Sequence, residues 1–493
     1  MNIIKNLKKT NLFLIYAIPV ITVTLLHIKK DQINDGSLSF LFLLKFYLTA
    51  IIADIGTGYY FSRFFNRFFK TAVLLCSFVF WFIAFAYILS FVLTFNLPTE
   101  SIFITVFDTT YHHTVDFLQI VPFHVYAGTF LYWGIWFFLW KNIQKPPFEK
   151  NDRFFYGLLF VSFSLLCFFT QWEGSFFKNS HKAWNAYSDL RKEIASLLNE
   201  ERQTAFELKS PETPQTIVVA IGESSNRRTF NENINDFKEK TAFLKNPPLI
   251  VNDATAIHPS TAYTLKKLLL PDNISLISIY RKAGFKTFWF SNHFKSGKND
   301  NIIYALTRNI DNRRYFNHTK TDLTYEYTSQ YYDDILLSPL KEALADPHPR
   351  KIIFLHLFGS HFPYVNRYPN ATEKLMIDQY AASVRYTSTV LAEALKLVQS
   401  SDQNSAFIYF SDHGTIPEMP FYRPDSGDEM FNIPMFFWIS NQYQERNNNI
   451  MKQLSCLSKM NPAKITFLIN HLSKMTITAL SVPDDMKKCF SIK

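Results

Sequence analysis

Residues 407–414 read FIYFSDHG, and this stretch decides the fold that we expect. An apolar, β-rich run predicts a buried strand, which here delivers an aspartate and a histidine at its carboxyl end. Residues 217–224, IVVAIGES, have the same form and bring in Glu223, and residues 352–361, IIFLHLFGSH, bring in His361. Open α/β sheets place their sites at the carboxyl ends of strands. The three runs therefore predict an α/β domain with one polar site at that edge.

A hydroxyl joins this set from residues 258–264, HPSTAYT, which contain Thr261. Taken singly, a residue of these types is more often a helix cap or a hydrogen-bonding group than a ligand. Together, the Thr261 hydroxyl, the Glu223 and Asp412 carboxylates and the His413 imidazole can hold one divalent metal. Zinc accepts oxygen and nitrogen ligands and lowers the pKa of a bound alcohol, which becomes a nucleophile. The combination predicts phosphoryl-transfer chemistry.

The N-terminal third has a different character. Residues 1–170 contain five long apolar stretches, whereas the remainder reads as a soluble domain. Two stretches have no charged residue and are long enough to span a bilayer, and two shorter ones can be completed by flanking Lys and Arg side chains. The fifth stretch contains Lys45, which either faces a polar interior or reaches the interface. The predicted spans are Leu12–Ile28, Leu38–Ala53, Thr71–Phe95, Ile120–Trp140 and Phe154–Thr170.

Lys and Arg counts in the short loops predict the orientation of these spans. The N-terminus and the second and fourth connections carry ten such residues, whereas the opposite loops carry only Lys29 and Lys30. The positive-inside rule then places the N-terminus in the cytoplasm and everything after Gln171 outside. A signal peptide at 12–28 is the alternative, but no A-x-A-type cleavage site follows it and Lys29-Lys30 is a poor cleavage context.

The pattern predicts three regions: a transmembrane domain at 1–171, a bridging helix and linker at 172–215, and a catalytic α/β domain at 216–493. Apolar residues of the bridge recur at steps of three and four, which predicts an amphipathic helix that lies on the bilayer surface or packs on the soluble domain. They are Trp184, Tyr187, Leu190, Ile194 and Leu198.

The net charge of +10 does not require a nucleic-acid partner, because much of the excess lies in the cytoplasmic loops and no basic stripe with interleaved aromatics occurs in the soluble part. Of the four cysteines, Cys76 and Cys167 fall inside predicted spans. Cys456 and Cys489 lie in the exported part, where they could form one disulfide.

These strings resemble the phosphoethanolamine transferases of Gram-negative envelopes, within the alkaline phosphatase and sulfatase superfamily. The resemblance rests on Gly222-Glu223, residues 261–264, residues 359–361 and residues 411–414, which occur in the family's order. It implies an α-helical membrane domain of five helices and a periplasmic α/β domain of alkaline-phosphatase and sulfatase type. It also implies that Glu223, Thr261, Asp412 and His413 bind a catalytic Zn²⁺, and that Thr261 carries the phosphoethanolamine intermediate.

The resemblance implies further contacts to the substrate. His361 would contact the phosphoryl group or a second metal, so the number of ions stays open. Asn292 matches a head-group residue of the family, and Lys295 lies nearby. The family's second phosphate-contacting His is absent, since no His lies between His413 and His471, and Glu429 occupies about its place.

An outer loop at residues 105–117 resembles the family loop that contacts the donor lipid. Its Thr is kept as Thr109, whereas the family's Asn is Thr105 and its Glu is His113. Asp116 remains as a partner for an ammonium group.

We therefore expect a monomeric inner-membrane enzyme that takes phosphoethanolamine from phosphatidylethanolamine, releases diacylglycerol, and modifies lipid A or a core sugar of lipopolysaccharide or lipooligosaccharide. One alternative is a phosphoglycerol transferase that uses phosphatidylglycerol. Others are a metal-dependent hydrolase and a non-enzymatic membrane sensor with a relic domain. A type I sulfatase is disfavoured because no C-x-P-x-R motif surrounds any of the four cysteines.

Overall fold

The computed structural model divides the chain into two compact units, Met1–Asp189 and Leu190–Lys493, with the division inside helix α8 (Trp172–Asn199). We describe each unit by itself. The described residues are 11, 14–19, 21–23, 25–26, 69–94, 97–108, 118, 121–143, 172–199, 208–209, 212–259, 261–294, 302–317, 331–369, 378–401, 404–417, 428–457, 459–477 and 480–490.

The first unit is helical. It contains α3 (Phe69–Thr94), α4 (Glu100–Asp108) and α6 (Phe123–Lys141). Polar groups of aromatic side chains join α3 to α6: the Trp136 indole donates to the Ser77 hydroxyl at 3.1 Å, and the Tyr132 hydroxyl donates to the Trp81 carbonyl at 2.9 Å. Buried polar groups in an apolar bundle need such partners.

Within the described residues, Val73–Leu93 is the one helical stretch long and apolar enough to cross a membrane, and a shorter apolar helix covers Leu14–Val23. The third and fourth predicted spans coincide with α3 and α6. The spans predicted at 38–53 and 154–170 lie outside the described residues, so the number of five stays a prediction. Phe130 and Leu131 of α6 are largely exposed, which suits a surface that faces lipid.

The second unit is built on a seven-stranded sheet of order β3-β10-β8-β2-β7-β5-β6. The five strands from β8 to β6 are parallel, and β10 runs antiparallel to both of its neighbours, β8 and β3. The strands are β2 (Gln215–Gly222), β3 (Leu249–Ile250), β5 (Lys286–Phe294), β6 (Asn312–Asn317), β7 (Arg350–His356), β8 (Ser405–Ser411) and β10 (Met435–Ile439).

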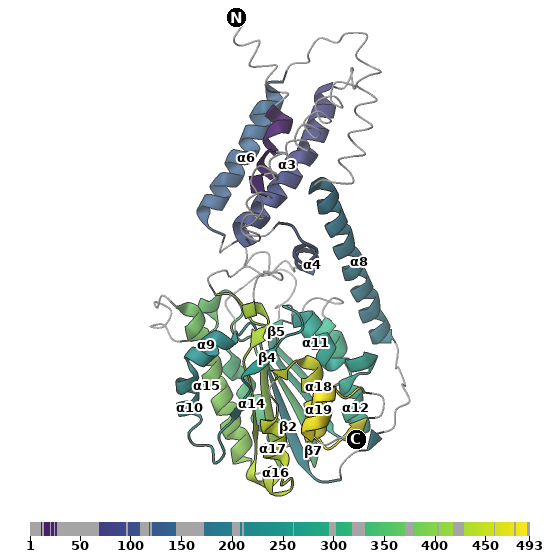
Figure 1. The fold of residues 1–493 in the computed structure, drawn as a ribbon, viewed down its shortest axis with the longest axis vertical. Helices are drawn as coiled ribbons and strands as arrows, with labels where there is room; N and C mark the ends of the chain where they lie inside the picture. The colour runs from purple at the N-terminus through teal and green to yellow at the C-terminus, as the bar shows by residue number, and fades with distance from the viewer. Residues whose placement is uncertain are drawn as a thin grey trace, which may run out of the picture. The chain divides into compact units, whose positions relative to one another are not determined.

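Helices cover both faces of this sheet, as Figure 1 shows. Alternate side chains of β2 enter two separate cores: Val219 lies in the core with α11, α12 and α18, and Val218 lies in the core with α10, α14 and α15. Because both faces are buried, the strand is an unbroken apolar run, as the sequence predicts. The covering helices are α11 (Thr261–Leu269), α12 (Leu276–Lys282), α18 (Pro462–Leu472), α10 (Ile234–Lys240), α14 (Leu337–Ala345) and α15 (Gln379–Ser400).

Smaller elements complete the unit. A three-stranded sheet has the order β11-β4-β9, and β1 pairs with β12, so the unit takes in residues 208–209, upstream of the predicted boundary at 216. Cys456 and Cys489 form a disulfide. The remaining elements are β1 (Leu208–Lys209), β4 (Asp253–Thr255), β9 (Asn432–Ile433), β11 (Lys459–Met460), β12 (Thr476–Ile477), α9 (Arg227–Glu232), α13 (Ile302–Leu306), α16 (Asn441–Glu445), α17 (Ile450–Ser455) and α19 (Asp484–Phe490).

Candidate metal and phosphoryl-transfer site

The carboxyl ends of the central parallel strands carry the predicted site. In the register of β2 and β8, Gly222 lies opposite Ser411. The next residues, Glu223 and Asp412, therefore leave the sheet side by side, and the Asp412 N–H donates to the Gly222 carbonyl at 2.9 Å. Both side chains are almost fully buried. Strand pairing thus brings together two carboxylates that are distant in sequence.

Thr261 reaches the same place from the start of α11. Its Oγ1 donates to Oε2 of Glu223 at 2.7 Å and lies 3.5 Å from Nε2 of His413. The first turn of a helix has backbone N–H groups without intrahelical acceptors, and these favour an anionic group. Thr261 therefore presents a hydroxyl to the carboxylates at a helix end suited to a phosphoryl group.

The ring of His413 is oriented by the backbone. Nδ1 donates to the Gly414 carbonyl at 2.7 Å, which leaves Nε2 turned toward the carboxylates. Nε2 lies 3.1 Å from Oε1 of Glu223 and 3.7 Å from Oδ2 of Asp412. A metal-ligating histidine commonly has its other nitrogen fixed in this way.

The buried carboxylates of Glu223 and Asp412 need a positive charge beside them. Burial raises the pKa of Asp412 to about 8, and the charge of Glu223 adds to the shift. Burial opposes ionisation of Glu223 as well, but the positive charge of His413 holds the pKa of Glu223 well below its ordinary value. Burial lowers the pKa of His413, and the two carboxylates outweigh this and raise it to about 10. The pocket therefore takes either a proton on His413 or a cation.

The ligand atoms of Glu223, Asp412 and His413 all lie within 4.8 Å of one another. Oδ2 of Asp412 is buried and has no hydrogen-bond partner within the described residues. A buried carboxylate oxygen without a partner is costly unless something binds it. Two carboxylates, one imidazole and the adjacent Thr261 hydroxyl fit a single divalent metal, and the mixed oxygen and nitrogen set suits zinc.

Ser224 supports this cluster. Its hydroxyl donates to Oε1 of Glu223 at 2.6 Å, and its N–H donates to Oδ1 of Asp412 at 3.3 Å. Ser224 has a φ of 56°, in the left-handed region that non-glycine residues rarely adopt. Such conformations cluster at functional sites, where the surrounding structure holds them in place.

Three predicted substrate residues are described. His361 is half-buried, its Nδ1 donates to the Phe362 carbonyl at 2.6 Å, and its charge acts on Glu223. Asn292 is fully buried, and its amide donates to the Tyr331 carbonyl and to Asp333, both at 2.9 Å.

Glu429, the third, pairs with Arg228, with Nε to Oε1 at 3.0 Å. Its backbone carbonyl packs so close to Gly414 that a Cβ at 414 would lie 1.9 Å from it. Glu429 therefore lies beside the loop that carries Asp412 and His413. The other predicted contacts lie outside the described residues, and they are Lys295, Thr109, His113 and Asp116.

Asp333 is a buried residue of the site that sequence reasoning missed. It accepts from the N–H of Phe358 at 2.7 Å, the N–H of Gly359 at 2.8 Å and the amide of Asn292 at 2.9 Å. Burial raises the pKa of Asp333, and these hydrogen bonds oppose the shift. Asp333 thereby ties the loop before His361 to the end of β5. The only signal in the sequence is an acidic pair after two tyrosines, which matches no motif.

Two histidines stack next to this loop. The rings of His293 and His356 lie 3.9 Å apart at an interplanar angle of 7°. His293 donates from Nε2 to the Leu357 carbonyl at 2.7 Å, and Nδ1 of His356 lies 2.9 Å from the Ser291 hydroxyl. Burial lowers the pKa of both histidines. Burial therefore favours the neutral form of both rings, which lie beside the loop held by Asp333.

This fold and this site define an α/β domain of the sulfatase type, and residues 216–460 match the sulfatase family. Phosphoethanolamine transferase EptC of Escherichia coli strain K12 is 25% identical to the chain over 409 residues, 70% of each protein. Phosphoethanolamine transferase CptA of Salmonella typhimurium strain LT2 is 27% identical over 304 residues, 52% of each.

Among solved structures, the integral membrane protein lipooligosaccharide phosphoethanolamine transferase A (EptA) from Neisseria meningitidis has a similar fold. The TM-score is 0.63 at 16% identity, and the match covers 96% of this chain and 97% of that one. Residues 216–460 thus form a sulfatase-family domain, and the chain is similar to proteins named phosphoethanolamine transferases.

Proposed function

We propose that this protein transfers phosphoethanolamine from phosphatidylethanolamine to a lipopolysaccharide or lipooligosaccharide acceptor, with Thr261 as the covalent carrier. The observation that carries the proposal is the hydrogen bond from Oγ1 of Thr261 to Oε2 of Glu223, 2.7 Å long, inside a buried set of metal-type ligands. The relatives named as phosphoethanolamine transferases support the choice of head group.

In the first step, Oγ1 of Thr261 forms a bond to phosphorus, and the bond from phosphorus to the diacylglycerol oxygen breaks. Before the attack, the Thr261 hydroxyl donates a hydrogen bond to Oε2 of Glu223, and in the attack Oγ1 loses this proton. The diacylglycerol oxygen leaves with the electron pair of the broken bond and takes up one proton, so proton loss and gain balance. The N-terminal N–H groups of α11 face the charge on the phosphoryl oxygens.

In the second step, an acceptor oxygen on lipid A or a core sugar forms a bond to phosphorus, and the bond from phosphorus to Oγ1 of Thr261 breaks. The acceptor oxygen gives up one proton and Oγ1 takes one up, so the threonine hydroxyl is restored. Two displacements through one covalent intermediate allow donor and acceptor to bind at different times. Glu223, Asp412, His413 and Thr261 would hold a Zn²⁺, with a second ion open. When bound, the metal supplies Lewis-acid stabilisation of charge, which is most of what phosphoryl transfer needs.

The donor contacts belong to the same proposal. His361 and Glu429 lie around the cluster, Asn292 lies near the carboxyl end of β5, and Lys295 is the next residue of the sequence after β5. Thr109, His113 and Asp116 of the outer loop would meet the ethanolamine ammonium, since a carboxylate favours a cation.

We further propose a monomer of the inner membrane, anchored by five spans, with a cytoplasmic N-terminus and a periplasmic catalytic unit. The disulfide between Cys456 and Cys489 supports export, because disulfides persist in oxidising compartments. The exposed apolar side chains of α6 support membrane residence.

The test uses the full chain in liposomes with phosphatidylethanolamine labelled in its head group. We expect labelled phosphoethanolamine on Thr261 by peptide mass spectrometry, together with release of diacylglycerol. Thr261→Ala should abolish the adduct, Thr261→Ser should keep part of it, and Ser260→Ala should leave it intact as the matched control.

The competing functions give different results in this assay. A phosphoglycerol adduct from phosphatidylglycerol, or equal turnover of both lipids, would assign the chain to the phosphoglycerol transferases. Diacylglycerol release without any acceptor product would indicate a hydrolase, and an absence of any adduct would indicate a relic domain. The native chain should prefer phosphatidylethanolamine to phosphatidylglycerol about tenfold. Asp116→Asn should reduce this preference by slowing the reaction with phosphatidylethanolamine selectively.

A further inference from the structure

The second unit, Leu190–Lys493, is the catalytic unit of the proposed function. It has a second polar cavity, far from the candidate metal ligands Glu223, Asp412 and His413. Its volume is 530 Å³, within the range of small-molecule sites. It is lined by the end of α16, the turn before α17, the end of α18 and the start of β12. β10 is antiparallel to β8, so α16, which follows β10, lies at the amino ends of the parallel strands. The cavity therefore lies at the opposite edge of the sheet from Glu223 and Asp412.

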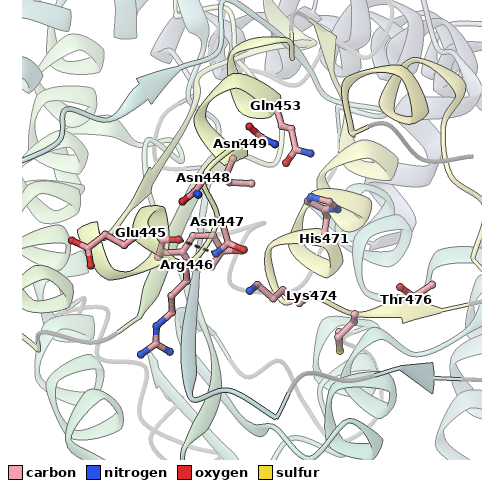
Figure 2. Close-up of a pocket in the computed structure, with 12 residues that line it drawn as sticks. Glu445, Arg446, Asn447, Asn448, Asn449, Gln453, His471, Lys474 and Thr476 are labelled. Carbon is pink, nitrogen blue, oxygen red and sulfur yellow. Dashed lines mark hydrogen bonds between the residues drawn. The ribbon is translucent and has the colours of Figure 1, made fainter.

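The charge of this cavity is positive. Arg446 and Lys474 line it, and neither forms an ion pair with a carboxylate in the part of the chain that the structure describes. Figure 2 shows the Lys474 side chain directed into the space below His471 and the 447–449 turn, whereas the Glu445 carboxylate and the Arg446 guanidinium point away from it. Since an unpaired cation in a concave site attracts anions, one part of the ligand should carry negative charge.

The position of Lys474 is unusual for a lysine. Its φ is 53°, in the left-handed region that glycine adopts at lower cost. Its N–H donates to the His471 carbonyl at 2.9 Å and closes the end of α18. A glycine would satisfy this turn better, so the side chain is retained at a conformational cost.

The rest of the lining includes four amides and the rings of Tyr443 and His471. Asn447, Asn448, Asn449 and Gln453 provide amide donors and acceptors, and Thr476 provides a hydroxyl. An amide offers two donors and an acceptor with two lone pairs, which matches a row of ligand hydroxyl groups. The chemistry of the lining is therefore that of a sugar site with an anionic end.

The walls are fixed by contacts to the C-terminal helix. The His471 ring lies 4.2 Å from the Phe490 ring of α19. The disulfide ties Cys456, which follows α17, to Cys489 in α19. Both walls are thus joined to one helix, so the cavity is formed before a ligand arrives and binding costs less ordering.

We propose that this cavity binds an acidic or phosphorylated sugar of monosaccharide size, with Lys474 on the anionic group and the 447–449 amides on the hydroxyls. The ligand is either a free sugar phosphate or the same chemistry within an envelope glycan. The proposed sugar site does not depend on the metal cluster, so it can be tested independently of the proposed transfer reaction.

The test is calorimetric titration of the full chain in detergent with glucose 1-phosphate, glucose and inorganic phosphate as separate probes. We expect glucose 1-phosphate to bind more tightly than either part alone. Lys474→Ala should weaken binding about tenfold or more, because a hydrogen bond to a charged group is lost. Arg446→Ala should weaken binding less, because its guanidinium points away from the space. Asn448→Ala should weaken the binding of glucose 1-phosphate but not the binding of inorganic phosphate.

Lys452→Ala is the matched control, since Lys452 is an exposed lysine of α17 that does not line the cavity. Thr261→Ala should bind the probe as the native chain does, which separates this site from the reaction. Displacement of glucose 1-phosphate by lipopolysaccharide would assign the site to a glycan, and its absence would assign it to a free sugar phosphate.

Three results would overturn the proposal: binding of none of the probes, equal binding of phosphate and glucose 1-phosphate, or unchanged binding in the Lys474→Ala variant. Thermal melting of each variant shows whether a loss of binding reflects a loss of fold. Both substitutions lie at exposed positions, so we expect native melting.

Discussion

Oδ2 of Asp333 accepts a hydrogen bond from the backbone N–H of Gly359 at 2.8 Å. Gly359 has a φ of 53°, and a Cβ there would lie 2.6 Å from the Glu223 carbonyl oxygen. Asp333 therefore holds a loop that packs directly on the backbone of a metal-type ligand. Its role is positional, because Asp333 acts on the site through this loop.

Asp333→Ala should destabilise the catalytic unit by about 3 kcal/mol or more, since three buried donors lose a charged acceptor. Activity should fall further than unfolding explains, with kcat more affected than KM. Denaturation curves and steady-state kinetics check this. Asp334→Ala, at the exposed neighbour, is the control, and equal behaviour of the two variants would contradict the positioning role.

Gly414→Ala should lower activity and metal content together by about tenfold or more. A Cβ at 414 would lie 1.9 Å from the Glu429 carbonyl oxygen, so the loop that carries Asp412 and His413 must move. The control is Gly134→Ala, where a Cβ would meet nothing within 4 Å. The zinc content of the purified variants is the measurement. A normal zinc content in Gly414→Ala would contradict the prediction that the contact at Gly414 positions Asp412 and His413.

Single substitutions Glu223→Gln, Asp412→Asn and His413→Gln should each remove zinc and reduce activity at least about a hundredfold, because the ligands act as one unit. Double variants should be little worse than single ones. Chelation of the native protein should have the same effect, with recovery on adding Zn²⁺. Full activity after exhaustive chelation would exclude the metal site. Glu342→Gln, in α14, is the control.

Stability should depend on pH through His471. Burial lowers the pKa of His471 to about 4, whereas the ordinary value in an unfolded chain is about 6.5. The unfolded state therefore binds a proton first, and stability falls as pH drops from about 6.5 toward about 4.

Allowing for solvent screening, the loss should be on the order of 1–2 kcal/mol. His471→Gln should remove that part of the pH dependence, and His348→Gln should not. Melting curves at about pH 7.5 and about pH 5 give the comparison. An unchanged pH dependence in His471→Gln would refute the assignment.

Much of this protein follows from local sequence. Short unbroken apolar runs favour strands buried on both faces, so residues 217–224 and 407–414 predict the strands found as β2 and β8 and the layered α/β fold. The polar residues after each run then fall at one edge of the sheet, which predicts that Glu223, Asp412 and His413 lie together. The structure brings them within 4.8 Å.

Tertiary structure alone decided the rest. The 2.7 Å bond between Thr261 and Glu223 joins residues 38 positions apart, and no pattern in the sequence fixes a hydrogen bond between side chains of different elements. Asn292 is fully buried and donates to Asp333, and the second cavity is lined by residues of two stretches of the chain, 443–453 and 471–476. Periodicity reports which face of an element is buried, whereas side-chain contacts depend on how elements pack, and packing is long-range in sequence.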